Sequence, residues 1–196
     1  KDAVAADACG RAADVQKEID WFLSREKDAN KVVDLLDAGE IPIRVTHNDT
    51  KLNNVMLDDV SGEGVCVIDL DTTMPGSAIY DFGDMVRTAT SPAPEDEVDT
   101  SKITMRIEMF ESLVRGYLKS ANSFLTDKER ENLAFSGKLL TLECGSRFLT
   151  DYLQGDVYFK VHRDGHNLDR TRSQMALVES IESQLPEMEK VVAKYS

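Results

Sequence analysis

Two short apolar runs joined by a turn, with polar residues at their outer ends, constrain this chain more than any other stretch. Val55–Leu57 and Val65–Ile68 are apolar, and the segment between them, DDVSGEG, is rich in residues that favour turns. The pattern predicts a β-hairpin, in which the entry to the first strand lies beside the exit from the second. We therefore expect Asp49 and Asn54 to converge with Asp69, although Asp49 and Asp69 are 20 positions apart.

The residues that meet at this end of the hairpin have the chemistry of phosphoryl transfer. Two carboxylates and an amide oxygen suit a hard divalent cation such as Mg²⁺, which also binds phosphate. On this interpretation Asp49 is the catalytic base, and Lys51 neutralises the transferred phosphoryl group. Asn54 and Asp69 are the expected metal ligands. Asp71 could bind a second metal, contact substrate or brace the loop.

Each of these assignments has a plainer structural alternative. Asp49 could cap its own turn, and Asn54 could only form hydrogen bonds at the hairpin end. Lys51 could be an exposed side chain without a role in catalysis. We expect His47 to pack beneath the loop and to bond backbone atoms, because Asp49 already occupies the role of the base.

The same residues carry a family resemblance. The pattern H-x-D-x-K-x-x-N at 47–54 has the spacing of the protein-kinase catalytic loop, and Ile-Asp at 68–69 follows where the metal-binding Asp is expected. With no Arg before Asp49, and with IDLD after the hairpin, the segment resembles the aminoglycoside phosphotransferase family of small-molecule kinases. Three blocks, HNDTKLNN, VIDLDTTMPGSAIYDFGD and RFLTDYLQGDVYFKVHRDGHNLDR, resemble its bacterial N-acetylhexosamine 1-kinases more narrowly, from about Val45 to the C-terminus.

This resemblance implies a fold class, cofactors and a substrate. The fold would be α+β and mostly helical, the C-terminal catalytic lobe of the protein-kinase-like fold with a small β-hairpin at the catalytic loop. The cofactors would be Mg²⁺ and ATP, and the acceptor the anomeric hydroxyl of an N-acetylhexosamine. Arg147 and Tyr158 would contact the sugar, since Arg offers a forked set of donors and Tyr a ring face and a hydroxyl. On its residues alone, Arg147 could equally pair with Asp151, four positions on.

A second motif needs to be separated from the first. Asp81-Phe82-Gly83 spells the metal-binding DFG of protein kinases, but it lies 32 residues after Asp49, where the pattern predicts the start of a helix. Asp69 follows the strand that pairs with the strand of the catalytic loop, so hairpin geometry favours Asp69 as the metal ligand. We expect Asp81 to support the catalytic loop through hydrogen bonds or to cap the helix.

Helical periodicity dominates the rest of the chain. Helices are expected over residues 2–27, 30–37, 78–89, 103–118 and 126–153, and from Asn167 or Asp169 to about Lys194. Thr126 and Glu129 predict a capping box, Gly155 a helix end, and Pro186 a break or kink in the last helix. The acidic segment 91–99 contains two prolines and is expected to be a flexible loop.

Charge and cysteine content exclude other classes of function. The formal net charge of −13 argues against a nucleic-acid partner, which would need clustered Lys and Arg. No apolar run reaches the length of a membrane span, so no membrane partner is expected. Cys9, Cys66 and Cys144 have no motif spacing, and we expect buried, reduced thiols in a cytoplasmic protein.

A complete kinase of this kind also has a β-rich lobe that holds the nucleotide. Neither its Gly-rich loop nor its strand Lys is found in this sequence, and Gly62 and Gly64 lie in the hairpin turn instead. We therefore expect residues 1–196 to be one catalytic lobe, inactive alone, with the nucleotide lobe of the same enzyme as its partner.

Two other functions are alternatives to the kinase hypothesis. VCVIDLDTT fits the first motif of haloacid-dehalogenase-type phosphatases, with Asp69 as nucleophile and Asp71 as acid/base. That class needs a doubly wound sheet, and the βαβ alternation that predicts such a sheet is missing from this sequence. It would also leave the HNDTKLNN block unexplained. The other alternative is a non-catalytic lobe that binds a sugar or a partner, against which the intact set of Asp49, Asn54 and Asp69 argues.

Overall fold

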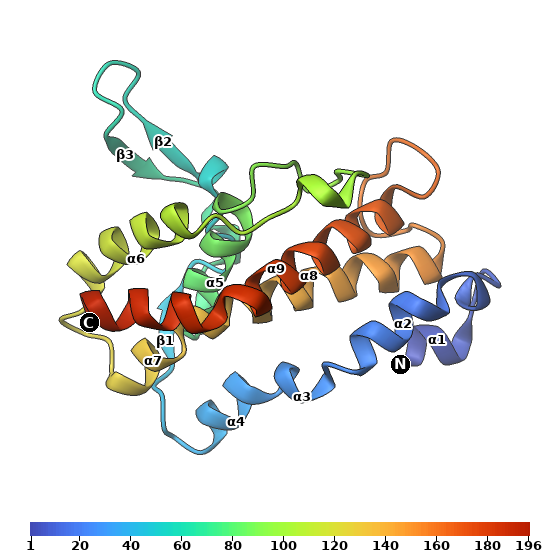
Figure 1. Cartoon of the computed structure of the whole chain (residues 1–196), viewed down its shortest axis with the longest axis horizontal. Coiled ribbons are helices and arrows are strands. Elements are labelled where there is room, and N and C mark those ends of the chain that lie inside the picture. Colours follow the sequence, from blue (N-terminus) through green and yellow to red (C-terminus); the bar gives the residue numbers. More distant parts are fainter.

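The computed structural model describes residues 1–196, the whole chain, and most of it is helical (Figure 1). Two long helices, α8 (Leu133–Gln154) and α9 (His166–Tyr195), pack along each other through much of their length. Helices α5 (Ala78–Ala89) and α6 (Ile107–Ala121) pack against this pair. The expected class, a mostly helical α+β fold, is confirmed.

The N-terminal segment forms a series of short helices along one side of the α8–α9 pair (Figure 1). They are α1 (Asp2–Ala6), the 3₁₀ turn η1 (Ala12–Val15), α2 (Gln16–Leu23), α3 (Glu26–Ala29) and α4 (Lys31–Asp37). The single helix expected over residues 2–27 is therefore wrong. Asp7 and Gly10 adopt left-handed backbone conformations, with φ of 36° and 67°, and such residues end a right-handed helix.

Two antiparallel sheets of two strands each frame the stretch that contains the candidate site. β1 (Arg44–Thr46) pairs with β4 (Met74–Gly76), and β2 (Val55–Leu57) pairs with β3 (Gly64–Val67). The second pair is the predicted hairpin, with Val55 opposite Val67, and it projects from the helical body (Figure 1).

The three cysteines differ in exposure, and the projecting hairpin accounts for that of Cys66. Cys66 lies in β3 and is exposed, as is Cys9, so the expectation that they are buried is wrong. Cys144 in α8 is buried, as expected.

None of the helices combines the length and the apolar character needed to cross a bilayer.

The main core joins the four larger helices. It includes Phe82 of α5, Phe110 of α6, Leu133 of α8, and Ile181 and Met188 of α9. Two smaller clusters of buried side chains attach the N-terminal helices, one around Val32 and Ile79 and the other around Ile19 and Leu153. Removal of these apolar surfaces from water is the main favourable contribution to folding.

Helix ends in the second half of the chain follow local signals. Thr126 Oγ1 accepts a hydrogen bond from the Glu129 amide, and Glu129 Oε2 accepts one from the Thr126 amide, which confirms the capping box. Gly155, with φ of 96°, ends α8 as predicted. The single helix expected here is nevertheless interrupted at Asn132, which separates α7 (Asp127–Glu131) from α8.

Two further helices, α9 and α6, differ from their expected bounds or shape. Helix α9 continues through Pro186, so of the break or kink that the sequence predicted there, the break does not occur. A proline inside a helix costs about 3 kcal/mol, but Met188 and Val192 beyond it are buried in the main core and hold the helix in place. The helix expected from residue 103 begins only at Ile107, because the 3₁₀ turn η4 (Thr100–Lys102) precedes an extended segment.

Glycines allow α5 and α8 to approach closely. A Cβ atom added to Gly83 would lie 2.5 Å from the carbonyl oxygen of Ser136, and one added to Gly137 would lie 2.5 Å from Cγ1 of Val86. Both distances are far shorter than a carbon atom tolerates, so only glycine fits. This close contact fixes the position of α5, which carries residues of the candidate site.

We predict that Gly137→Ala lowers the free energy of unfolding by about 1–3 kcal/mol, because the new methyl group overpacks the α5–α8 contact. Gly116→Ala in α6 is the matched control, since a Cβ there meets no atom within 4 Å. It should raise stability by up to about 1 kcal/mol through helix propensity. Chemical denaturation of both variants checks this, and equal effects would contradict the proposed close packing.

Candidate active site

The loop between β1 and β2 is held by the side chain of Asp81, in the first turn of α5. Asp81 Oδ2 accepts a hydrogen bond from the His47 amide at 2.9 Å, and Oδ1 accepts one from the Asn48 amide at 2.7 Å. The Thr50 hydroxyl donates to the Asp81 carbonyl oxygen. Asp81, the first residue of the DFG sequence, thus belongs to helix α5 and holds the loop between β1 and β2, as expected.

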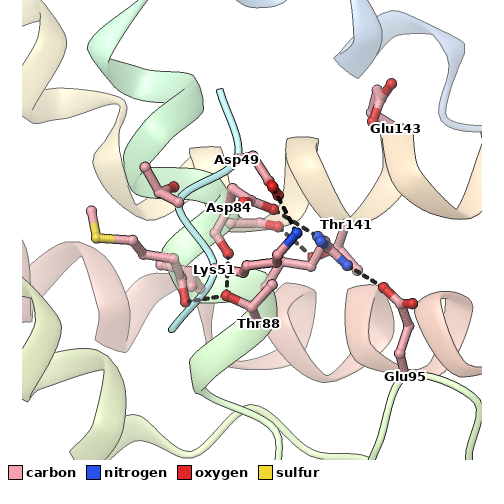
Figure 2. A network of polar contacts seen from close by, with 12 residues as sticks. Asp49, Lys51, Asp84, Thr88, Glu95, Thr141 and Glu143 are labelled. Carbon is pink, nitrogen blue, oxygen red and sulfur yellow. Dashed lines mark hydrogen bonds and ion pairs between the residues drawn. The ribbon is translucent and has the colours of Figure 1, made fainter. Parts of the chain in front are cut away.

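Asp49, Lys51 and Asn54 form one hydrogen-bonded group (Figure 2 labels the first two). Lys51 Nζ lies 2.6 Å from Asp49 Oδ2, and Asn54 Nδ2 donates to the same oxygen at 2.8 Å and to the Asp49 carbonyl oxygen. Partial burial opposes ionisation of Asp49, but the hydrogen bonds from Lys51 and Asn54 outweigh it and hold the Asp49 pKa below its usual value. Asp49 is therefore an ionised carboxylate at neutral pH.

His47 links the catalytic loop to the end of the hairpin. Its Nε2 atom lies 3.0 Å from the carbonyl oxygen of Ile68, and its Nδ1 accepts a hydrogen bond from the Asp49 amide. The hydroxyl of Thr72 donates to the His47 carbonyl oxygen. These contacts keep the residues before β2 beside those after β3.

Asp69 follows β3 in a left-handed conformation, with φ of 62°, and its side chain makes no capping hydrogen bond. The amide of the preceding residue, Ile68, donates a hydrogen bond to the Asn54 carbonyl oxygen at 2.9 Å, which places Asp69 beside the Asp49 group. The Asp49 hydrogen bond, and to a smaller extent the charge of Asp69, raises the Lys51 pKa. Asp71 lies in the exposed turn η3 (Leu70–Thr72), and no hydrogen bond links it to the other candidates.

The available donor atoms fit a magnesium ion. Asn54 uses its Nδ2 atom toward Asp49, which leaves its Oδ1 as an acceptor. This oxygen and the Asp69 carboxylate are hard donors of the kind that Mg²⁺ prefers, with water or phosphate completing its shell. Nowhere do three or more His, Cys, Asp or Glu side chains gather as a metal cluster. A metal ion here would therefore need water or phosphate oxygens to complete its coordination.

A cavity of about 870 Å³ opens beside Asp49, between α5, α8 and the N-terminal helices. Apolar residues that line it include Phe22, Leu139 and Leu142, and polar ones include Asp49, Asp84, Arg87, Glu143 and Arg147. Its volume is that of a small-molecule site. A hydroxyl-bearing molecule in this cavity would be within reach of the Asp49 carboxylate.

Arg147 lines this cavity, whereas Tyr158 lies at its edge and is largely exposed. An Arg147 Nη atom lies 3.4 Å from the Tyr158 hydroxyl, and the guanidinium lies 5.7 Å from the centre of the tyrosine ring. The ion pair of Arg147 is with Glu143, four residues earlier, and not with Asp151. Asp151 instead accepts hydrogen bonds from the backbone amides of residues 157–159 and so shapes the loop that presents Tyr158.

Sequence reasoning missed Asp84, Arg87 and Glu143. Asp84 Oδ1 accepts a hydrogen bond from Arg87 Nε at 3.0 Å, and Arg87 also bonds Glu95 at 2.6 Å (Figure 2). Asp84 Oδ2 is buried without a partner, and burial raises the Asp84 pKa. For Asp84 and Arg87 a signal was available, because they are three positions apart, a spacing at which side chains meet on a helix surface.

The acidic segment 91–99, expected to be flexible, is linked to the helices at several points. Glu95 bonds Arg87 of α5, while Asp96 accepts hydrogen bonds from Arg163 at 2.9 Å and contacts His166 at 3.0 Å. The His166 side chain is buried. The segment therefore connects the region beside the catalytic loop with the start of α9.

A sequence profile described as the phosphotransferase enzyme family (APH) matches residues 1–117, more than half of the chain. The chain belongs to this family. The matched region contains the catalytic loop, the hairpin and α5. The helical domain described above is accordingly the C-terminal lobe of the kinase-like fold, and phosphotransferase chemistry is the activity of its family, whose members generally use ATP and Mg²⁺.

We predict that Lys51→Ala raises the Asp49 pKa, because a hydrogen bond that stabilises the ionised carboxylate is lost while its burial remains. NMR titration of the Asp49 carboxyl carbon should show its transition at higher pH than in the wild type. Lys51→Arg, which keeps the positive charge, should shift it less. An unmoved transition in Lys51→Ala would mean that Lys51 does not control this carboxylate.

Proposed function

We propose that this chain is the catalytic lobe of an ATP-dependent kinase that phosphorylates a small hydroxyl-bearing molecule. The best candidate for the acceptor is the anomeric hydroxyl of an N-acetylhexosamine. The observation that carries the proposal is the ionised Asp49 carboxylate, which is hydrogen-bonded to Lys51 and Asn54 and lies at the wall of a cavity of small-molecule size. Family membership supports the phosphotransferase part of the proposal.

In the proposed reaction the acceptor hydroxyl oxygen bonds to the γ-phosphorus of ATP, and the bond from that phosphorus to the ADP oxygen breaks. The hydroxyl proton passes to Asp49, which is ionised and therefore able to accept it. Lys51, whose ammonium lies 2.6 Å from Asp49, supplies positive charge where the phosphoryl group is transferred. When bound, Mg²⁺ would neutralise the phosphates, with Asn54 and Asp69 as the residues that hold it.

A sugar suits the mixed lining of the cavity. Hydroxyl groups on its edges can bond the polar side chains near Asp49, while its ring face can pack on apolar residues such as Phe22 and Leu139. Arg147 and Tyr158 offer further donors and an aromatic surface at the outer edge of the site. The N-acetylhexosamine is proposed from the resemblance of the sequence blocks around these residues.

The nucleotide would need a partner surface, and we place it at the hairpin. Met56 and Val67 are each about half exposed, and Val65 is 66% exposed. Exposed apolar side chains on a projecting hairpin favour an interface rather than contact with water. We propose that a β-rich nucleotide-binding lobe of the same enzyme covers this surface and delivers ATP to Asp49.

The alternative functions lack comparable support. A haloacid-dehalogenase-type phosphatase needs a doubly wound parallel sheet, whereas both sheets here consist of two antiparallel strands. Asp69 would be its nucleophile, but Asp69 leads into a 3₁₀ turn after an exposed hairpin strand. A lobe that only binds a sugar would not require the hydrogen-bonded set of Asp49, Lys51 and Asn54.

We predict that Asp49→Asn lowers kcat by about 10²–10⁴-fold, because the proton acceptor is lost. The measurement is acceptor-dependent ADP release with Mg²⁺-ATP, made on the enzyme that joins this lobe to its nucleotide-binding lobe. The acceptors are N-acetylglucosamine, N-acetylgalactosamine and unmodified sugars. Asp37→Asn, at the exposed end of α4, is the matched control and should retain wild-type turnover.

In the same assay Asp69→Asn should raise the Mg²⁺ concentration needed for half-maximal rate by about tenfold or more, since one anionic metal ligand becomes neutral. Turnover within a few-fold of wild type in both Asp49→Asn and Asp69→Asn would show that these roles are wrongly assigned. Absence of ADP release from the wild-type enzyme with every sugar would reject the sugar-kinase proposal itself.

A further inference from the structure

Glu143 and Arg147 lie one helical turn apart on α8 and both line the cavity that contains Asp49. Residues at positions i and i+4 of a helix project from the same face, so the two side chains enter the cavity next to each other. Figure 2 shows Glu143 on α8, apart from the hydrogen-bonded group around Asp49 and Lys51. The two residues thus form a second polar end of the cavity.

The Glu143 carboxylate lacks the hydrogen bond to a cationic side chain that Asp49 and Asp84 each have in the same cavity. Asp49 is bonded to Lys51 and Asp84 to Arg87, whereas the nearest cation to Glu143 is Arg147 Nε, at 3.7 Å. That distance is too long for a hydrogen bond. The one hydrogen bond at Glu143, from the Ser146 hydroxyl, goes to its backbone oxygen.

The surroundings of Glu143 disfavour the ionised form of its carboxylate. About half of its side chain is exposed, and the residue lines the cavity. Enclosure by the cavity walls raises the Glu143 pKa, in opposition to Arg147 and Arg87, which means that the ionised form is incompletely solvated. A ligand that donates a hydrogen bond to this carboxylate would replace the missing solvation.

The polar contacts of the Arg147 guanidinium are also long. Its hydrogen bond to the Tyr158 hydroxyl is long, at 3.4 Å, and its ion pair with Glu143 is loose. Because both side chains are long and about half exposed, rotamer changes can separate them. The group that fits between them must donate to a carboxylate on one side and accept from a guanidinium on the other. It must also be neutral, since Arg147 would repel an ammonium group.

A trans amide has this pattern, because its N–H and its C=O point in opposite directions. We propose that Glu143 and Arg147 are the specificity-determining pair for the acceptor, with Glu143 accepting the N–H and Arg147 donating to the carbonyl oxygen of an acetamido group. This inference rests on the proposed function and extends it, since it assigns the selection of an N-acetylated sugar to two named side chains.

The test is acceptor binding to the chain itself, measured by NMR titration with N-acetylglucosamine, glucosamine, glucose and 2-deoxyglucose. Wild-type protein should bind N-acetylglucosamine most tightly. Glu143→Gln should weaken that binding by about tenfold, because a charge-assisted hydrogen bond is lost, and should leave the weaker binding of 2-deoxyglucose unchanged. Glu143→Asp, which keeps the charge on a shorter stem, should restore part of the loss. Glu131→Gln, in exposed α7, is the matched control and should change nothing.

Three results would overturn the inference. They are an unchanged affinity of Glu143→Gln for N-acetylglucosamine, an equal loss for all four sugars, and a wild-type preference for glucosamine. Thermal unfolding of each variant separates a loss of fold from a loss of recognition. Since binding is measured without ATP, failure of this inference is distinct from absence of ADP release, which would reject the kinase proposal.

Discussion

The carboxylate of Asp81 is the interaction on which the catalytic loop depends. It accepts the amide hydrogens of His47 and Asn48, which lie beyond the end of β1 and have no strand partner there. The Asp81 carboxylate supplies the acceptor that each of these amides needs, so the loop gains its shape from α5. The helix is in turn fixed by the contact of Gly83 and Gly137 with the facing helices. The position of Asp49 therefore follows from helix packing.

Electrostatic pairing then sets the chemistry of the loop. Lys51 and Asn54 keep Asp49 ionised despite its partial burial. Arg87 bonds one oxygen of Asp84, but burial outweighs this contact and raises the Asp84 pKa. Arg87 also bonds Glu95 of the acidic segment. Asp49 and Asp84, which line the same cavity, are thus each hydrogen-bonded to a cationic side chain.

Local patterns predicted well those features that depend on a few neighbouring residues. The hairpin, helix α5 and the capping box of Thr126 and Glu129 are of this kind, and the family match confirms the resemblance to the phosphotransferase family. Features that depend on packing were missed. The continuation of α9 through Pro186 needs the buried residues beyond it, and the N-terminal helix breaks at left-handed residues that periodicity does not reveal. Glu143 became a candidate only when α8 was seen beside the Asp49 loop.

Amide hydrogen exchange of His47 and Asn48, compared between wild type and Asp81→Ala, tests the dependence of the loop on α5 most directly. The account predicts that both amides are protected in the wild type and exchange about 10–100-fold faster in the variant, as expected when their acceptor is removed. Amides in the α8–α9 core should keep their protection. Unchanged exchange at His47 and Asn48 in a folded Asp81→Ala variant would contradict the claim that Asp81 holds the catalytic loop.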